Sequence, residues 1–187
     1  LVIATLVEDA AELIGGNALL ARVGAYYHDL GKLAAAGDEK EERRVGGDVA
    51  LYFAENQRGS GNPHDKLDPA RSAAILRRHV HQSVAKIRTY RLGQKVADIA
   101  AQHHGTSLME HFYTKAVMQA QLAGKMVDER DYRYPGPKPQ SKEAALVMLA
   151  DSVEAAVRAM ESHSEETIFA RVRAIVEKRV DDGQLDD

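Results

Sequence analysis

The segment Ala25–Lys32, with the sequence AYYHDLGK, joins an apolar helical pattern to an adjacent histidine and aspartate. Apolar residues recur at helical spacing through 18–30, which predicts a helix with His28 and Asp29 at its end. Adjacent side chains on a helix point about 100° apart. One metal ion can therefore take both side chains only at a helix terminus, unless the aspartate bridges two ions. A lone His-Asp pair is common, so its meaning depends on other ligands.

Further histidines and one late aspartate supply such ligands. They are His79, the pair His103 and His104, and Asp151. Imidazoles and carboxylates suit Mn, Fe, Co, Ni and Zn. Two neighbouring metal ions are a common means of cleaving phosphodiesters. Together with His28 and Asp29, these residues predict a dinuclear phosphohydrolase site, although each histidine alone could be an ordinary core or surface residue.

Asp151 is the most telling of these residues because it lies on an apolar helix face. Ala144, Met148, Asp151 and Ala155 follow the spacing of one helical stripe. An ionised carboxylate on such a stripe is costly to bury without a counter-charge or a metal ion. The pattern leaves two interpretations open, a metal ligand or a buried ion pair with an arginine or lysine.

Composition limits the class of protein. The 187 residues fit one domain, and 44% hydrophobic with only 5% aromatic residues favours an all-helical fold. A net charge of -3 gives no general attraction to a nucleic acid polymer, so a phosphate ligand needs local cations or metal. Cysteine is absent, which excludes disulfides and thiolate ligands. The apolar runs 1–6 and 144–150 are far shorter than the ~20 residues that span a bilayer.

Capping residues and prolines divide the rest of the chain into helices and connections. Asp68 before Pro69 and Ser141 predict helix starts, and Ser107 with Glu110 predicts a capping box. The stretch 62–65 is turn chemistry, 134–139 is too rich in proline to be helical, and 34–50 predicts an irregular insertion. The expected helices cover about 1–14, 18–30, 68–80, 94–104, 108–124, 141–162 and 165–180.

Taken together, these motifs resemble one known family. AYYHDLGK at 25–32 resembles the motif of the HD phosphohydrolase superfamily. The fuller pattern is similar to the cytosolic HD domain of the seven-transmembrane HD proteins, the PgpH-type cyclic-di-AMP phosphodiesterases. The similarity extends over nearly the whole chain. The segments that carry it are Glu55–Gln57, Asn62–Asp65, His79–Val80, His103–Ser107, Phe112–Tyr113, YPGPKPQ at 134–140, LADSVEA at 149–155 and Asp182–Leu185.

The resemblance implies an all-α, HD-domain helical bundle over 1–187 with the metal site between helices. It implies that Asp29 bridges two divalent transition-metal ions, Mn or Fe. His28 and Asp151 would bind the first ion, and His79, His103 and His104 the second. The family has a further histidine ligand, expected just before Leu1. Since the chain opens within an apolar helical pattern, we expect it to be a fragment of a longer membrane protein.

On the substrate side, Lys32 is expected to clamp a phosphate and act in catalysis, against the alternative of an ordinary solvated lysine. Tyr113, Tyr134 and Arg71 are expected to contact the substrate, although tyrosines on apolar faces are more often core and arginines on a helix face are often solvated. His64-Asp65, a second His-Asp pair, is expected to be structural or to support the metal ligands, and not to bind metal itself. Surface positions are expected for His81, His111 and His163.

The resemblance implies hydrolysis of cyclic di-AMP to pApA by a hydroxide that two metal ions activate. One alternative is an HD phosphohydrolase acting on another nucleotide. A second alternative is a nucleotide-sensing module that has lost catalysis, for which the missing first histidine is the one favourable feature. The expected partner is a cyclic dinucleotide and no nucleic acid polymer. The expected location is the cytoplasmic side of a bacterial plasma membrane, with the membrane reached only through a preceding N-terminal part.

Overall fold

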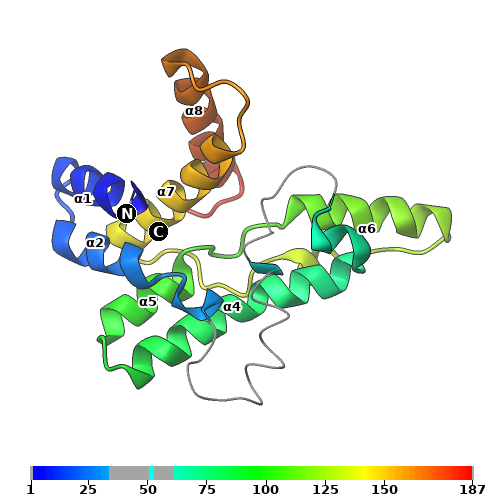
Figure 1. Ribbon diagram of the computed structural model, residues 1–187, viewed down its shortest axis with the longest axis horizontal. Coiled ribbons are helices and arrows are strands. Elements are labelled where there is room, and N and C mark those ends of the chain that lie inside the picture. Colours follow the sequence, from blue (N-terminus) through cyan, green and yellow to red (C-terminus); the bar gives the residue numbers. More distant parts are fainter. Residues whose placement is uncertain (1, 34–50, 53–60, 187) are drawn as a thin grey trace.

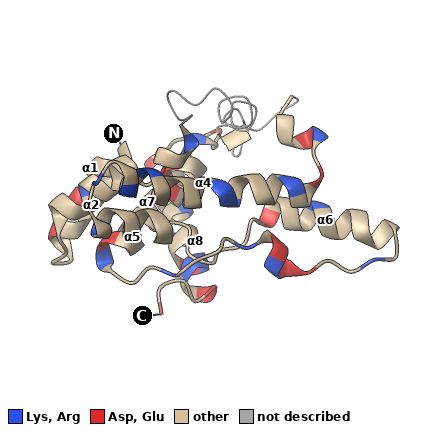
Figure 2. Cartoon of the chain, turned by 90° about the horizontal axis from the view of Figure 1, so that it is seen from below, with Lys and Arg blue, Asp and Glu red and all other residues tan. Residues whose placement is uncertain are grey.

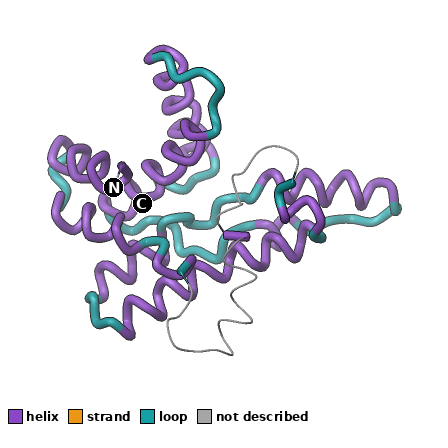
Figure 3. The backbone as a smooth tube through the Cα atoms, in the orientation of Figure 1, coloured by secondary structure: helices purple, strands orange, loops and turns teal. Residues whose placement is uncertain are grey.

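The computed structural model describes residues 2–33, 51–52 and 61–186, and their regular structure is helical (Figures 1 and 3). Within these residues the β-structure amounts to an isolated bridge between Leu108 and Arg133. The predicted all-α fold is confirmed. The expected insertion at 34–50 and the segment Glu55–Gln57 lie outside the described residues.

Along the chain, α-helices are joined by loops and by short 3-10 turns. The longer helices are α1 Val2–Leu13, α2 Ala18–Tyr27, α4 Pro69–Thr89, α5 Gln94–Gln102, α6 Glu110–Leu122, α7 Lys142–Arg158 and α8 Glu165–Asp181. The 3-10 turns are η1 Leu30–Lys32, η2 Pro63–Lys66 and η3 Glu129–Tyr132.

Alanines let the helices α1, α2 and α7 pack closely. Ala4, Ala11, Ala21 and Ala144 are almost completely buried where these helices meet. At the contact of α2 with α5, a Cβ added at Gly24 would lie 2.6 Å from Cδ1 of Ile99. Small side chains at these contacts bring the helices near enough for short polar side chains to meet between them.

Larger side chains form a second core on the other side of α4. Leu76 of α4, Phe112 of α6 and Tyr132 of η3 are buried together, and α6 extends away from the rest of the helices (Figure 1). A third cluster, which includes Ile87 and Ala100, joins α4 to α5. The end of α2 and the middle of α4 lie between these apolar clusters.

The turn η1 lies directly against α4 because Gly31 has no side chain. A Cβ at Gly31 would collide with the carbonyl oxygen of His79 and with the backbone and hydroxyl of Ser83. The Gly31 amide instead donates a hydrogen bond of 2.8 Å to Oγ of Ser83. This contact places the residues on both sides of Gly31, Asp29 and Lys32, next to the His79 turn of α4.

The predicted helix ends are partly corrected. α2 ends at Tyr27 instead of Leu30, since His28 closes it as C-cap and η1 follows as a tighter turn. His28 and Asp29 therefore lie at a helix terminus, as predicted. α4 continues to Thr89 instead of ending near residue 80, because the buried stripe continues through Ser83 and Ile87. The polar Ser83 obscured that stripe in the sequence.

The predicted capping box at Ser107 is wrong. α6 begins at Glu110, and Oγ of Ser107 donates to the carbonyl of His104 at 2.7 Å. Residues 107–109 are held extended instead, because Tyr134 N donates to Ser107 O and Met109 N donates to Tyr132 O. The backbone groups of Ser107 and Met109 that make these bonds to 132–134 are therefore not available for the first turn of a helix.

Other caps agree with the sequence prediction. The Asp68 side chain accepts a hydrogen bond from Ala70 N, and Ser141 accepts one from Ala144 N. α7 ends at Arg158, a few residues before the predicted end near 162. α8 begins at Glu165, as predicted.

Charged side chains of both signs are interspersed over the helices (Figure 2). Over the described residues, neither sign of charge therefore dominates the helices, and the net charge of the whole sequence is -3. Within the described residues, no helix combines the length and hydropathy needed to cross a membrane.

We expect Gly31→Ala to destabilise the fold by about 3 kcal/mol, because the added methyl meets backbone atoms of α4 that cannot rotate away. Ser83→Ala should lower stability by only about 1 kcal/mol, since it removes one hydrogen bond and adds no atom. Urea unfolding followed by circular dichroism would measure both. Equal stability of Gly31→Ala and the wild type would show that η1 does not depend on this close contact.

Candidate metal centre

All the predicted ligands that the chain contains meet at one place. His28 and Asp29 follow α2, and His79 lies in the middle of α4. The pair His103 and His104 directly follows α5, the first as its C-cap. Asp151 lies on α7. Helix ends and helix faces from four parts of the chain thus direct imidazoles and carboxylates into one region.

The carboxylate of Asp29 occupies the middle of the cluster. Its Oδ1 lies 3.4 Å from Nε2 of His79 and 3.7 Å from Nε2 of His103. Its Oδ2 lies 3.5 Å from Nε2 of His28 and 2.8 Å from Nζ of Lys32. The two oxygens therefore face different histidines, which is the arrangement that a carboxylate bridging two ions requires.

Asp151 closes the cluster from α7. Its Oδ1 lies 3.5 Å from Nε2 of His28, and its Oδ2 lies 4.0 Å from Nδ1 of His104. Its partners in the described residues are thus histidines of the cluster. The sequence left open a buried ion pair between Asp151 and an arginine or lysine. Within the described residues, no arginine or lysine pairs with Asp151.

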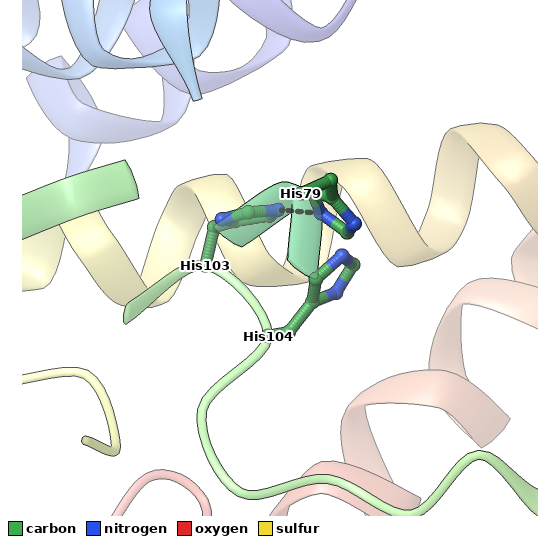
Figure 4. A group of neighbouring side chains, drawn as sticks. All are labelled: His79, His103 and His104. Atoms are coloured by element: carbon green, nitrogen blue, oxygen red, sulfur yellow. Dashed lines mark hydrogen bonds between the residues drawn. The ribbon is translucent and has the colours of Figure 1, made fainter. Parts of the chain in front are cut away.

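His79, His103 and His104 form a compact group in which each can direct one ring nitrogen to a common point (Figure 4). The Nε2 atoms of His79 and His103 are 3.3 Å apart. His28, Asp29 and His103 form a second group of the same kind, so His103 belongs to both. The first grouping matches the ligand set expected for the second ion.

The backbone orients two of the imidazoles. Nδ1 of His28 lies 2.7 Å from the carbonyl oxygen of Ala25, and Nδ1 of His103 lies 2.7 Å from that of Ala100. A carbonyl can only accept, so each Nδ1 carries a proton and each Nε2 faces the cluster, where a metal ion would bind it in its unprotonated form. Metal-binding histidines are commonly held in this way.

The pKa values follow from burial and from the two carboxylates. Burial lowers the pKa of His79 to about 3 and that of His103 to about 4, so both rings are neutral. Burial opposes the charge on His28 too, but Asp29 and Asp151 outweigh it and raise the pKa of His28 to about 9. Although burial acts to raise the pKa of Asp29, His28 and Lys32 lower it below its usual range.

These residues fit a metal centre. His28 Nε2, Asp29 Oδ1 and His104 Nε2 are buried without a hydrogen-bond partner. Buried polar atoms are normally satisfied, so several unsatisfied nitrogen and oxygen lone pairs at one point indicate a cation. The His-rich and carboxylate-containing donor set suits divalent transition metals.

The comparison with known proteins agrees with this geometry. A model of the HD domain matches residues 1–156. The chain belongs to the HD domain family. Divalent metal binding is what this family implies for the His and Asp cluster described above.

Relatives match this HD domain over nearly its whole length. It is 46% identical over 183 residues to the cyclic-di-AMP phosphodiesterase PgpH of Bacillus subtilis (strain 168), a match that covers 98% of this chain and 23% of that protein. It is 40% identical over 185 residues to PgpH of Listeria monocytogenes serotype 1/2a (strain 10403S), covering 99% of this chain and 23% of that protein. The chain thus spans less than a quarter of these curated relatives.

A solved structure shares the fold. The crystal structure of the L. monocytogenes phosphodiesterase PgpH HD domain in complex with cyclic-di-AMP superposes with a TM-score of 0.80 at 40% identity. The match covers 98% of this chain and 77% of that chain. The predicted HD-domain helical fold is therefore confirmed.

A cavity of about 1540 Å³ opens beside the metal centre of the HD domain, and Asp29, His104 and Asp151 belong to its wall. Two of the predicted substrate contacts, Lys32 and Tyr134, line it as well. The Tyr134 ring stacks on His104 with centroids 4.1 Å apart, so one of its faces supports a predicted ligand.

The other predicted substrate contacts lie elsewhere. Arg71 is exposed near the start of α4 and does not line the cavity. Tyr113 does not line it either, and its ring packs near Tyr132 with centroids 5.8 Å apart. The structure therefore gives these two residues no place at the site, and their contact with substrate stays a prediction.

The remaining histidines are outside the cluster. His64 is buried, its Nε2 lies 2.9 Å from Leu51 O, and its ring packs against Phe112. It is part of the core between α4 and α6, as expected for a structural residue. The histidines predicted to lie on the surface are exposed, namely His81, His111 and His163.

Sequence reasoning assigned no role to the C-terminal residues that hold the loop after the histidine pair. Oε1 of Gln184, which is 1% exposed, accepts a hydrogen bond of 2.9 Å from Thr106 N and packs against Gly105. Arg133 donates to Thr106 O at 2.9 Å and binds Asp182 with both terminal nitrogens. The segment Asp182–Leu185 belongs to the family pattern, but only the fold reveals its contact with this loop.

We expect Asp29→Ala to weaken metal binding by more than about 100-fold, because it removes the carboxylate that contacts both histidine groups. Helical content should stay near that of the wild type, since the Asp29 side chain is not part of an apolar cluster. Metal content after gel filtration and far-ultraviolet circular dichroism would test this. His81→Ala, on the exposed face of α4, is the matched control and should keep its metal; full metal content in Asp29→Ala would contradict the bridging position.

Proposed function

We propose that this HD domain is the catalytic part of a metal-dependent phosphodiesterase that hydrolyses cyclic di-AMP to the linear dinucleotide pApA. The observation that carries the proposal is the cluster of His28, Asp29, His79, His103–His104 and Asp151 at the wall of a large cavity. The PgpH relatives and the cyclic-di-AMP complex of one of them supply the substrate.

We assign Asp29 to bridge two ions, His28 and Asp151 to the first ion, and His79, His103 and His104 to the second. When bound, two divalent ions supply Lewis-acid activation of the attacking water and neutralise charge on the phosphoryl oxygens. The protein holds the metal ligands close together. The proposed reaction needs no side chain as nucleophile, because water attacks the phosphorus. His28, whose pKa is raised to about 9, is the ligand that has to release a proton on metal binding.

The proposed metals are Mn and Fe. The donor set mixes imidazole with carboxylate and lacks thiolate, and the carboxylates have oxygens that face more than one histidine. Such sets suit octahedral ions better than the closed tetrahedral sites of structural Zn.

Lys32 is placed to act on the substrate phosphate. Its ammonium lies 2.8 Å from Oδ2 of Asp29, and its side chain is largely buried at the cavity wall. This position holds a positive charge beside the predicted bridging carboxylate, where negative charge on a phosphoryl group would develop. Lys32 thereby contributes electrostatic stabilisation of the transition state.

The cavity is large enough for a dinucleotide, since typical small-molecule sites hold about 300–1,000 Å³, compared with about 1540 Å³ here. Val2 and Ile3, at the start of α1, belong to its wall. The family's further histidine, expected just before Leu1, would therefore enter the same site.

The alternative of a sensing module without catalysis is less well supported. Buried polar atoms without a hydrogen-bond partner, such as His28 Nε2 and Asp29 Oδ1, lower the stability of the fold unless a cation binds them. Their presence therefore favours a site that still binds metal. Hydrolysis of another nucleotide is the remaining alternative, and a substrate panel separates it from the proposal.

For the whole protein, we propose a longer chain that is anchored in a bacterial plasma membrane and presents this HD domain to the cytoplasm. The support is the family resemblance and the match to less than a quarter of each PgpH relative. The cytoplasm is the compartment in which a cyclic dinucleotide messenger would be met.

We expect the domain, extended to include the residues before Leu1 and supplied with Mn, to convert cyclic di-AMP to pApA. Cyclic di-GMP and a nucleoside triphosphate, assayed beside it and separated by chromatography, should react at least about tenfold more slowly, because polar contacts to a base typically discriminate by this factor or more. Tight binding of cyclic di-AMP without product would favour the sensing module. Faster turnover of another substrate would favour the second alternative.

Replacing Lys32 by glutamine should lower kcat by about 100-fold while the metal content stays unchanged, since it removes a charge and not a ligand. Lys95→Gln, on the exposed face of α5, is the matched control and should behave as wild type. A Lys32→Gln variant with normal kcat would mean that this lysine only balances the charge of Asp29.

A further inference from the structure

The cavity beside the metal centre has cationic side chains in its wall, and one of them differs from the rest. The lysines and arginines that line it are Lys32, Arg158, Lys178 and Arg179. Lys32 pairs with Asp29 at 2.8 Å, Arg158 with Glu154 at 3.3 Å and Lys178 with Glu110 at 2.6 Å. Arg179, in contrast, forms no ion pair with a carboxylate of the described residues.

The Arg179 guanidinium is hydrogen-bonded to a hydroxyl. Its Nη2 donates a hydrogen bond of 3.0 Å to Oγ of Ser152. Asp182, three residues further along the chain, is bound by both terminal nitrogens of Arg133 at 3.0 and 3.2 Å. Asp182 also accepts a hydrogen bond from Gln184. The guanidinium of Arg179 therefore retains donors that no carboxylate uses.

Burial makes this arrangement costly for the free protein. Arg179 is half-buried between α7 and α8, and burial lowers its pKa, although a guanidinium remains charged at every physiological pH. The carboxylates of Asp182, Asp151 and Glu110 attract the guanidinium, but none of them pairs with it within 4.0 Å. An anion that binds it directly would therefore offset the cost of its burial. A planar guanidinium also matches the two oxygens of a phosphate by a pair of parallel hydrogen bonds. The cavity-facing donors of Arg179 are suited to a phosphate ligand.

The position of Ser152 shows that a phosphate bound by Arg179 would lie apart from a phosphate bound at the metal centre. Ser152 follows Asp151 directly on α7, and adjacent helical side chains point about 100° apart. Asp151 points toward the histidine cluster, so Ser152 and the guanidinium that it holds lie to one side of the cluster. Both belong to the wall of the same cavity.

A cyclic dinucleotide carries two phosphodiesters, and a dinuclear centre cleaves one at a time. We propose that Arg179 binds the phosphodiester that is not being cleaved, with Ser152 orienting its guanidinium. This inference rests on the proposed function, since it requires a substrate with two phosphates. It makes Arg179 a residue that selects dinucleotides over ligands with a single phosphate.

The test is steady-state hydrolysis of cyclic di-AMP by the metal-loaded, N-terminally extended domain and its Arg179→Gln variant. An interaction with the phosphate remote from the reaction should affect binding and leave the chemical step intact. We expect KM to rise about 10- to 100-fold, the usual effect of losing a charge-assisted hydrogen bond, with kcat within about threefold of wild type. Arg179→Lys keeps the charge but not the paired donors and should give an intermediate KM.

Arg173→Gln is the matched control, because Arg173 lies on the same helix, is exposed and does not line the cavity. Its KM should equal that of wild type. Circular dichroism and metal content show whether Arg179→Gln is folded and loaded; if it is not, Arg179→Lys and Ser152→Ala carry the test, and both should raise KM without lowering kcat.

Two results would overturn the inference while the proposed function stands. An unchanged KM in folded Arg179 variants would mean that no substrate phosphate contacts this residue. A lower kcat with unchanged KM would place Arg179 at the phosphate being cleaved. Absence of turnover in the wild type would instead overturn the proposed function, and the inference with it.

Discussion

The partial burial of two carboxylates among imidazoles is the constraint on which the rest of this structure depends. Asp29 and Asp151 approach His28, His79 and His103 to within 4 Å, and several of these donors have no hydrogen-bond partner. Lys32 and a protonated His28 neutralise part of the carboxylate charge, but the buried atoms without partners remain unfavourable unless a metal ion binds them. The fold therefore has to hold the donors rigidly enough for metal binding to outweigh this penalty.

Several features of the scaffold supply that rigidity. Gly31 lets η1 lie directly on α4, which fixes Asp29 beside His79. Carbonyl groups at the ends of α2 and α5 orient His28 and His103 through their Nδ1 atoms. Arg133 and the C-terminal Gln184 hold the loop after His104 by hydrogen bonds to Thr106. Among the cations that line the cavity, Lys32, Arg158 and Lys178 each pair with a carboxylate. Arg179 is bonded to Ser152 instead, so it is the cation we propose to bind an anion.

The residues that carry the metal chemistry could be predicted from the sequence because their types and helical spacing are local properties. His28 and Asp29 at a helix end, and Asp151 on a buried stripe with Ala144 and Met148, are found where the pattern places them. Caps at Asp68 and Ser141 were likewise readable, because each depends on a hydrogen bond within one helical turn. The low aromatic content predicted the all-helical fold.

Contacts between distant segments could not be predicted in this way. The pairing of 107–109 with 132–134 removed the helix start expected at Ser107, although the local capping pattern was present. Arg71 had the right charge but lies away from the cavity, whereas Arg179, more than a hundred positions later, reaches it because α8 packs on α7. The sequence by itself determined which side chains can bind metal and where helices form, since both follow from residue type and period. Only the tertiary structure decided which cations remain without a carboxylate partner, because that depends on which helices meet.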